Sequence, residues 1–356
     1  MKNLILLFFI VFFFSLEIKG QENTSLQFSS LEEAGFNRDS IETLINLIQE
    51  TPSKDFRGLV VIKDNRIVIE EYFNTFMRYS VLDIRSAGKS ITALALGVAM
   101  KEGLFESLDQ SIYSLFSEKE NPSINEDYTK FTIRNALNMS SGLDADSDNW
   151  KSQGQAGQWI ERDDWKEYIL NIPLIRTPGK RFVYADIHPL LIGLAIEEAS
   201  GKSLKEYAQE KLFDPLGIHQ VYWYTNTSNQ TGAAGNLYLS TLDFAKLGML
   251  VANEGKWGDS QIIDREYIKD LKNTKDPSIG DWYSLADTYG YFWYKSTRTF
   301  GGKTFDYLFA SGNGGNQLIV IPEEGIVIAL TASAYGQGYG HGRSHAIMGK
   351  VLSALE

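Results

Sequence analysis

The sequence predicts a mixed α/β fold, in which an antiparallel sheet is built from both ends of the chain, is flanked by helices and carries an inserted helical lobe. Two observations predict it. Strand-like runs rich in β-branched residues fall near the two ends, at residues 58–72 and 307–331, and helical spacing dominates between them. With 356 residues, of which 43% are hydrophobic and 22% charged, the chain is long enough to bury a large core.

The first 20 residues differ from the rest of the chain. Lys2 precedes an apolar run over residues 4–14, and polar residues follow from Glu17. Such a run is short for a membrane span and is typical of a secretory signal. We therefore expect residues 1–20 to be a signal peptide and the protein to be exported, either periplasmic or secreted. An uncleaved N-terminal membrane anchor stays open, because the cleavage pattern around residues 19–21 is weak.

The remaining chain divides into two predicted lobes. Residues 21–105 and 236–356 form the lobe that contains the sheet, and residues 106–235 form the helical lobe. In the first lobe we expect a helix capped at residues 37–40 and a hairpin of residues 58–62 and 67–72.

The other helices and strands are predicted from the same periodicity. Residues 144–164 lack periodicity, which predicts a lid or binding loop. Trp150 and Trp159 would supply apolar contact area in this loop, and Trp150 is the candidate substrate contact. The predicted helices are 106–120, 132–139, 190–200, 204–212, 241–253 and 344–355, and the predicted strands are 307–310, 317–321 and 326–331.

A serine and a lysine three residues apart indicate the chemistry. Ser86 is the only serine in the chain with a lysine at this spacing, and on a helix it shares one face with Lys89. The first turn of a helix offers free N–H groups that favour negative charge. A capping serine followed by a solvated lysine would give the same pattern, but the small apolar residues 93–99 favour a buried helix. We interpret Ser86 as an acyl-transfer nucleophile.

A serine nucleophile needs a base, and further motifs indicate where that base lies. Residues 181–190 place Tyr184 and Asp186 directly before a Leu-Leu-Ile-Gly helix, and residues 310–316 form a glycine-rich strand. With residues 132–143 and 232–240, these motifs resemble the serine β-lactamase and penicillin-binding-protein superfamily. The nearest types are class C β-lactamases, family VIII esterases and 6-aminohexanoate-dimer hydrolases. The resemblance implies a β-lactamase-like fold over residues 30–355.

The resemblance also implies roles for individual residues. Tyr184 corresponds to the tyrosine that shares the base role with Lys89. Asp186 replaces the more common asparagine, and a carboxylate accepts hydrogen bonds but cannot donate them. It would hold Lys89 charged and disfavour an anionic substrate group. Ser311 and Gly312 stand where the family has Lys-Thr-Gly or His-Thr-Gly, so the cation that binds a substrate carboxylate is missing.

An oxyanion hole is expected between the first helical turn and this strand. The backbone N–H of Ser86, together with that of Gly312 or Asn313, would bind the oxyanion. A plain glycine-rich hairpin turn is the simpler interpretation of residues 312–315. His341 is a further candidate substrate contact, on a loop over the site.

Other functional classes are disfavoured. The net charge of −11 argues against nucleic-acid binding. His341 and His345 have the spacing of a metal-binding pair, but no His-Glu-x-x-His pattern accompanies them, and we expect neither a metal nor a cofactor. No cysteine is present, which excludes disulfides and thiolate chemistry.

The sequence thus predicts an exported serine hydrolase that cleaves an ester or amide of a small molecule or short peptide through an acyl-serine intermediate. Two alternatives remain. One is a β-lactamase or D-Ala-D-Ala carboxypeptidase, which keeps the reaction and changes the substrate. The other is a catalytically silent binding module with the same fold.

Overall fold

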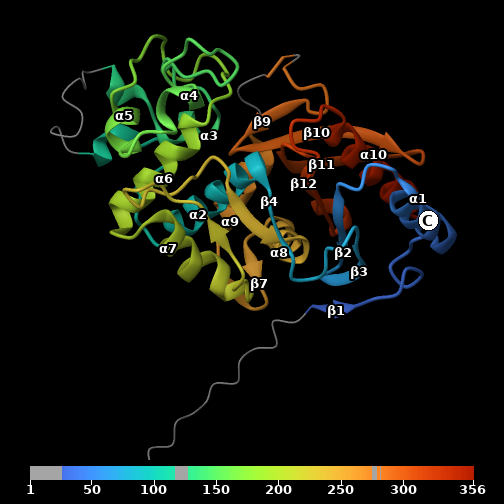
Figure 1. Cartoon of the computed structure of the whole chain (residues 1–356). Coiled ribbons are helices and arrows are strands. Elements are labelled where there is room, and N and C mark those ends of the chain that lie inside the picture. Colours follow the sequence, from blue (N-terminus) through green and yellow to red (C-terminus); the bar gives the residue numbers. More distant parts are fainter. Residues whose placement is uncertain (1–25, 117–126, 275–278, 281) are drawn as a thin grey trace, which may run out of the picture.

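The computed structural model describes residues 26–116, 127–274, 279–280 and 282–356, and its largest element is an eight-stranded sheet (Figure 1). Each pair of neighbouring strands is antiparallel except the short parallel pair β1 and β3. In spatial order the strands are β1 (Gln27–Phe28), β3 (Arg66–Tyr72), β2 (Phe56–Lys63), β13 (Ile326–Ala332), β12 (Asn316–Ile321), β11 (Lys303–Gly312), β10 (Trp293–Phe300) and β9 (Thr288–Gly290). The predicted sheet from both chain ends is confirmed. The predicted signal peptide lies outside the described residues.

The pairing of β2 with β13 joins the two halves of the sheet. Residues 59–62 of β2 and all residues of β13 are buried, so this seam lies at the centre of the core. The predicted hairpin of β2 and β3 turns at Asp64 and Asn65, whose φ angles are +49° and +63°. Such left-handed angles are those of the two-residue turns that match strand twist, and Asp and Asn tolerate them well.

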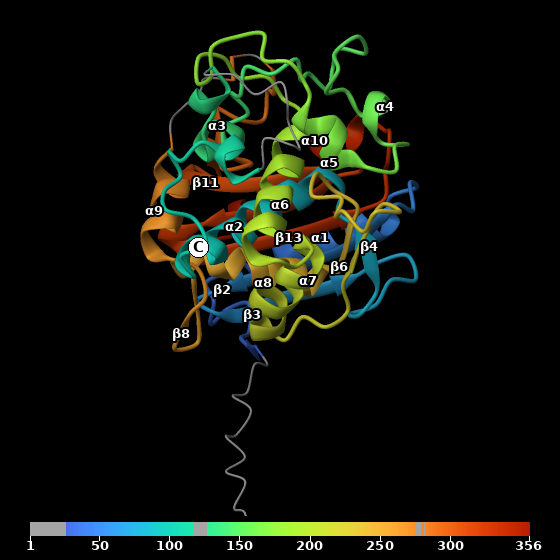
Figure 2. The same cartoon turned by 90° about the vertical axis from the view of Figure 1, so that its left-hand side faces the viewer.

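Helices cover both faces of the sheet (Figures 1 and 2). Helix α8 (Thr241–Ala252) packs on β2, β12 and β13, where a Cβ on Gly248 would lie 2.6 Å from Val327 Cγ1. Helices α1 (Arg38–Glu50) and α10 (Tyr339–Ser353) pack on each other on the opposite face. The capped helix after Asn37 is confirmed as α1, because the Asn37 side chain accepts a hydrogen bond from the Ser40 N–H.

The first turns of α10 differ from the prediction, which began the last helix at residue 344 and placed His341 on a loop. The helix begins at Tyr339. A Cβ on Gly340 would lie 2.9 Å from the Gly314 carbonyl carbon, so only glycine lets this turn pack against the β11–β12 hairpin. Tertiary packing therefore overrides the low helix propensity of glycine.

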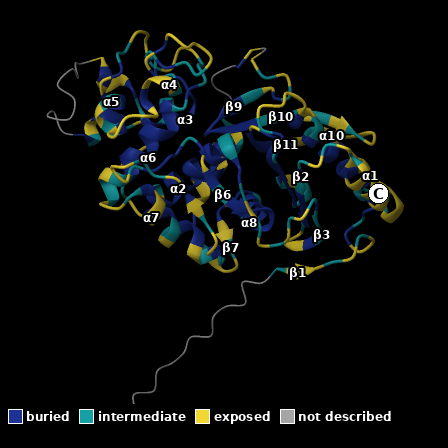
Figure 3. Cartoon of the chain, viewed as in Figure 1, coloured by how far each residue is buried: buried dark blue, intermediate teal, exposed yellow. Residues whose placement is uncertain are grey.

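Helix α2 (Gly88–Lys101) connects the sheet with the helices of the middle of the chain, and its residues 88–99 are all buried (Figure 3). It contacts both α6 (Ile187–Ser200) and β11. The remaining helices are α3 (Ile133–Leu137), α4 (Ala156–Trp159), α5 (Trp165–Leu170), α6 (Ile187–Ser200), α7 (Leu204–Ala208) and α9 (Arg265–Asn273). The remaining strands are β4 (Val81–Asp83), β5 (Tyr222–Trp223), β6 (Leu237–Ser240), β7 (Lys256–Trp257) and β8 (Ser260–Gln261). No helix over the described residues is long and apolar enough to cross a membrane.

The predicted helix over residues 106–120 is wrong in its described part. Only a short 3₁₀ turn forms there, at Ile112–Leu115, and residues 117–120 lie outside the described residues. The Ser107 hydroxyl accepts a hydrogen bond from the Asp109 N–H, and the Gln110 side chain accepts one from the Glu106 N–H. Side chains that bond nearby backbone groups in this way compete with helix formation.

Candidate active site

Ser86 lies in a 3₁₀ turn, Arg85–Ala87, that leads directly into α2. Arg85 has a φ of +55°, an unusual conformation for a residue other than glycine. Its N–H donates a hydrogen bond to Asp83 Oδ1 at 2.8 Å, and its guanidinium lies 4.4 Å from the centre of the Tyr335 ring. These contacts hold the backbone in a strained form directly before the candidate nucleophile, as is common at functional sites.

Lys89 brings Ser86 and Asp186 together. Its side chain is buried, and its ammonium nitrogen lies 2.9 Å from Ser86 Oγ, 2.9 Å from Asp186 Oδ1 and 2.8 Å from the carbonyl oxygen of Ala234. Three acceptors therefore match the three N–H donors of an ammonium group.

The contacts of Lys89 keep it protonated. Burial acts to lower the pKa of Lys89, but the negative charge of Asp186 and the neighbouring Tyr184 outweigh it and raise the pKa above its ordinary value. The Lys89 ammonium at neutral pH donates a hydrogen bond to Ser86 Oγ and cannot accept its proton. The expected effect of Asp186 on the charge of Lys89 agrees with this geometry.

Tyr184 contacts the same lysine from a second side. The Lys89 ammonium lies 5.1 Å from the centre of the Tyr184 ring. The ring of Trp282 stacks on Tyr184 with centroids 4.7 Å apart, and the Trp282 indole N–H donates to Asp148 Oδ2 at 2.9 Å. Trp282 carries no signal in the sequence, because no motif or periodicity surrounds it.

The end of strand β11 is pressed against the turn that carries Ser86. A Cβ on Gly312 would lie 1.9 Å from the carbonyl oxygen of Ile84, so glycine is required there. Asn313 follows, and its side-chain oxygen accepts a hydrogen bond from the Gly336 N–H at 2.7 Å. The structure therefore brings Gly312 and Asn313 beside Ser86, where the sequence predicts the oxyanion hole.

Ser311 and His341 belong to a neutral hydrogen-bonded cluster. Ser311 Oγ lies 3.0 Å from His341 Nδ1 and 3.2 Å from the Tyr283 hydroxyl. Burial lowers the pKa of His341 and raises that of Tyr283 to about 12. Both groups are uncharged at pH 7, so Ser311 is surrounded by hydrogen-bonding groups without a formal charge. His341 itself lies in α10, not on the expected loop.

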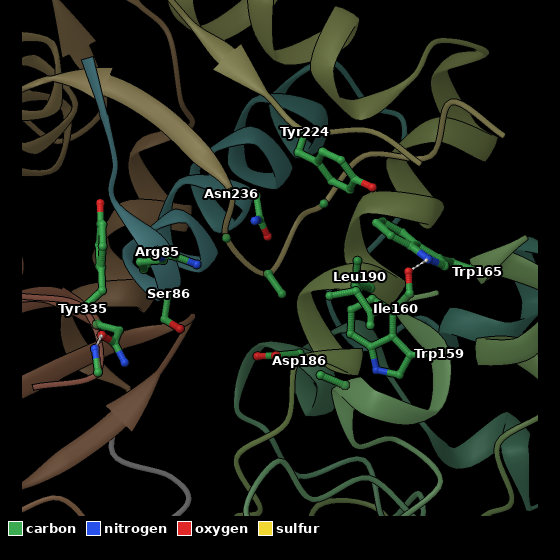
Figure 4. Close-up of a pocket in the computed structure, with 16 residues that line it drawn as sticks. Arg85, Ser86, Trp159, Ile160, Trp165, Asp186, Leu190, Tyr224, Asn236 and Tyr335 are labelled. Atoms are coloured by element: carbon green, nitrogen blue, oxygen red, sulfur yellow. Dashed lines mark hydrogen bonds between the residues drawn. The ribbon is translucent and has the colours of Figure 1, made fainter. Parts of the chain in front are cut away.

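A pocket of about 650 Å³ opens beside Ser86 (Figure 4). Ser86, Asp186 and Asn313 line it together with Arg85 and Tyr335. The lining also includes apolar and aromatic side chains that Figure 4 shows across the pocket from Ser86: Trp159, Ile160, Trp165, Leu190 and Tyr224.

The predicted contact Trp150 lies away from this pocket, and so does the buried His188. The Trp150 side chain is 72% exposed and does not line it, whereas Trp159 of the same segment does. His188 is buried, with Nε2 2.7 Å from Ser141 Oγ, and burial lowers its pKa to about 4.

The two histidines of α10 contact different partners. His341 contacts Ser311, whereas His345 Nε2 lies 3.0 Å from the Tyr307 hydroxyl. Across the described ranges, no three His, Cys, Asp or Glu side chains are grouped so that they could hold a metal ion.

The chain is similar to known enzymes in sequence and in fold. The family described as Beta-lactamase matches residues 44–348. A candidate D-alanyl-D-alanine carboxypeptidase of Escherichia coli O157:H7 is 28% identical over 308 residues, which is 68% of this chain and 70% of the relative. The lovastatin esterase of Penicillium rubens is 28% identical over 244 residues, covering 54% of this chain and 60% of the relative. A solved structure of a candidate 6-aminohexanoate-dimer hydrolase from Bacillus anthracis is similar in fold, with a TM-score of 0.71, 17% identity and coverage of 93% of this chain and 88% of that one.

Proposed function

Because this chain belongs to the Beta-lactamase family and is a serine hydrolase, we propose that Ser86 is its nucleophile. The enzyme cleaves an ester or amide through an acyl-Ser86 intermediate. One observation supports this most directly: the Lys89 ammonium lies 2.9 Å from Ser86 Oγ at the edge of a pocket that Ser86 lines. A cation beside the hydroxyl stabilises the alkoxide that forms when the proton leaves.

The charge of Lys89 separates the roles of the two proposed base residues. Since Lys89 is protonated, Tyr184 as a phenolate takes the proton from Ser86, and the Lys89 ammonium stabilises that phenolate. The Ser86 oxygen attacks the carbonyl carbon, and the N–H groups of Ser86 and Asn313 bind the oxyanion. As the tetrahedral intermediate collapses, Tyr184 gives its proton to the leaving group. Tyr184 then takes a proton from water, whose oxygen attacks the acyl carbon, and returns that proton to Ser86 Oγ as the bond to the acyl group breaks.

Labelling with an acylating probe tests the nucleophile. We expect a fluorophosphonate to add one mass increment, located on the peptide that contains Ser86. The Ser86→Ala variant should lose the label and at least ~10³-fold in kcat/KM on p-nitrophenyl acetate, since the nucleophile is removed. Ser228→Ala, which removes an exposed hydroxyl, serves as the control. A folded wild-type protein that takes no label would instead support the catalytically silent binding module.

A neutral ester is the proposed substrate in preference to a β-lactam or a D-Ala-D-Ala peptide, although the Escherichia coli relative carries a carboxypeptidase name. Both of those alternatives carry a carboxylate, and here Asp186 lines the pocket and Ser311 contacts only uncharged groups among the described residues. We expect hydrolysis of p-nitrophenyl esters to exceed that of nitrocefin. A higher kcat/KM on nitrocefin would overturn the ester proposal and leave the acyl-serine mechanism intact.

Export is part of the proposal and is supported by the residue pattern of the first 20 positions. Fractionation of a bacterial host that expresses the full chain, with intact mass of the recovered protein, tests it. We expect the protein outside the cytoplasm with its first 20 residues removed. A full-length product in the membrane fraction would support the anchor, and a cytoplasmic product would contradict export.

A further inference from the structure

The pocket beside Ser86 has a continuous apolar wall. Trp159 and Ile160 come from α4 and its C-terminal end, Trp165 begins α5, and Leu190 lies in α6. Tyr224 follows strand β5 and completes the wall (Figure 4). At about 650 Å³ the pocket is within the range of small-molecule sites, whose walls are mostly apolar and aromatic.

The two indole N–H groups of this wall are bonded within the protein. The Trp159 indole N–H donates to the carbonyl oxygen of Gly154 at 3.3 Å, and that of Trp165 donates to the carbonyl oxygen of Ile160 at 3.3 Å. The two indoles pack edge to face with centroids 5.3 Å apart. The indole N–H groups are thus occupied, and the aromatic carbon surface remains for a ligand.

The charged side chains that line the pocket are already paired. Asp186 pairs with Lys89 at 2.9 Å, and Arg85 pairs with Asp83 at 3.1 Å while its guanidinium lies over the Tyr335 ring. A ligand anion would face the Asp186 carboxylate at the mouth of the pocket, and binding it to Arg85 would compete with Asp83. The pairing therefore favours an uncharged ligand group.

The position of Tyr184 indicates which part of a substrate the pocket holds. In the proposed reaction Tyr184 gives its proton to the leaving group, so the leaving group lies toward Tyr184. Tyr184 does not line the pocket, and its ring is covered by Trp282 instead. The pocket is therefore on the other side of the scissile bond, where the acyl group stays attached to Ser86.

We propose that this pocket binds the acyl group of the substrate and selects uncharged, apolar acyl chains or aromatic acyl groups. This inference rests on the proposed acyl-serine function and extends it to a substrate class. Each methylene that leaves water for the wall should improve kcat/KM by about fourfold until the pocket is filled.

An acyl-chain series tests the inference. The probes are p-nitrophenyl acetate, butyrate, hexanoate and octanoate, with p-nitrophenyl hydrogen succinate as the anionic match for butyrate. For the wild-type protein we expect kcat/KM to rise at least 10-fold from acetate to octanoate, and the succinate to react at least 10-fold more slowly than butyrate. Octanoate esters of short and long aliphatic alcohols should differ little, because the leaving group lies outside the pocket.

Two variants of the exposed part of the wall add a structural test. Tyr224 and Ile160 are 40% and 47% exposed, so Tyr224→Ala and Ile160→Asp should fold. Each should lower the octanoate-to-acetate ratio of kcat/KM about 10-fold. Tyr222→Ala is the matched control, because Tyr222 is 52% exposed two residues away and does not line the pocket, and it should leave the ratio unchanged.

The outcomes distinguish this inference from the proposed function. Ser86-dependent hydrolysis of acetate without any preference for longer or neutral acyl chains would overturn the acyl-pocket inference alone. A kcat/KM that depends on the length of the alcohol, and not on that of the acyl chain, would overturn it as well, because the leaving group would then occupy the pocket. Absence of Ser86-dependent hydrolysis of every ester would overturn the proposed function.

Discussion

Asp186 stands two residues after Tyr184, and its carboxylate lies 2.9 Å from the Lys89 ammonium in a largely buried environment. An asparagine at this position would donate a hydrogen bond, whereas the carboxylate supplies a charge. That charge compensates the burial of Lys89, which would otherwise favour the neutral amine. One side chain thus sets the protonation state on which the proposed division of roles between Lys89 and Tyr184 depends.

Asp186→Asn should move the alkaline limb of the pH profile of kcat/KM to lower pH. Removing the carboxylate lowers the pKa of Lys89, because burial then acts with less opposition, and the ammonium that supports the Tyr184 phenolate is lost at lower pH. The measurement is kcat/KM for p-nitrophenyl acetate between pH 6 and 11. Asp259→Asn, at an exposed position, should leave the limb in place. An unchanged limb in Asp186→Asn would show that Asp186 does not control the charge of Lys89.

At the scale of elements, the end of β11 and the turn before α2 form one structural unit. Gly312 has no room for a side chain against the Ile84 carbonyl, and the Arg85 backbone is held in a strained conformation by Asp83. The distance between the strand end and Ser86 is therefore determined by backbone contact. An oxyanion hole shared between a turn and a strand needs such a fixed distance.

Gly312→Ala should lower kcat by about 100-fold with the overall fold retained. The added methyl group separates the strand from the turn, and a displacement of about 1 Å lowers the rate of catalysis by about 100-fold. Ester hydrolysis and urea unfolding followed by circular dichroism give the two readouts. Gly338→Ala is the control, since a Cβ at that position meets nothing within 4 Å. Full activity in folded Gly312→Ala would contradict the role given to this contact.

Local patterns predicted the elements whose cause is local. Helix α1, the β2–β3 hairpin and the C-terminal strands depend on capping, turn residues and periodicity, and each is confirmed near its expected position. The first turns of α10 depend on packing against Gly314, and the helix predicted from residue 106 is replaced by side-chain hydrogen bonds to the backbone. At both places hydrophobic periodicity therefore predicted the wrong secondary structure. Strand β10 and helix α9 were not predicted at all.

In the candidate site, too, contacts with a local cause in the sequence were predicted and contacts between distant segments were not. Ser86 lies in the 3₁₀ turn that runs directly into α2, so its contact with Lys89 follows from their spacing. The resemblance to a family located Tyr184 and Gly312. Trp282 and the choice of Trp159 over Trp150 depend on how distant loops fold over one another. A single sequence contains no local signal for such contacts.

At the scale of the whole molecule, His188 should make the fold sensitive to acid. Its pKa falls from 6.5 to about 4 on folding, so between these values the unfolded chain binds a proton that the folded protein does not, and stability is lost as the pH falls from 6.5 to 4. At about 1.4 kcal/mol per pKa unit, this one group accounts for about 3 kcal/mol over the full range.

His188→Gln should therefore weaken the pH dependence of the free energy of unfolding. Measured by urea unfolding at pH 7.5 and pH 4.5, the loss of stability on acidification should be smaller than in the wild type by about 2 kcal/mol. His219→Gln is the control, because the His219 side chain is 69% exposed, and it should reproduce the wild-type difference. An identical difference in His188→Gln would show that the buried imidazole is not the acid-sensitive group.

The seam between β2 and β13 joins segments more than 260 residues apart in the chain. Pairings of such long sequence separation form late, since a large loop must close before they gain any contact energy. A nascent chain that has emerged only as far as α8 has β3 beside β2, but it lacks β13, which pairs with the other side of β2, and β11, whose end presses against the turn that carries Ser86. Completion of the candidate site is thus delayed until translation has passed β13, and until then the growing polypeptide lacks its central sheet.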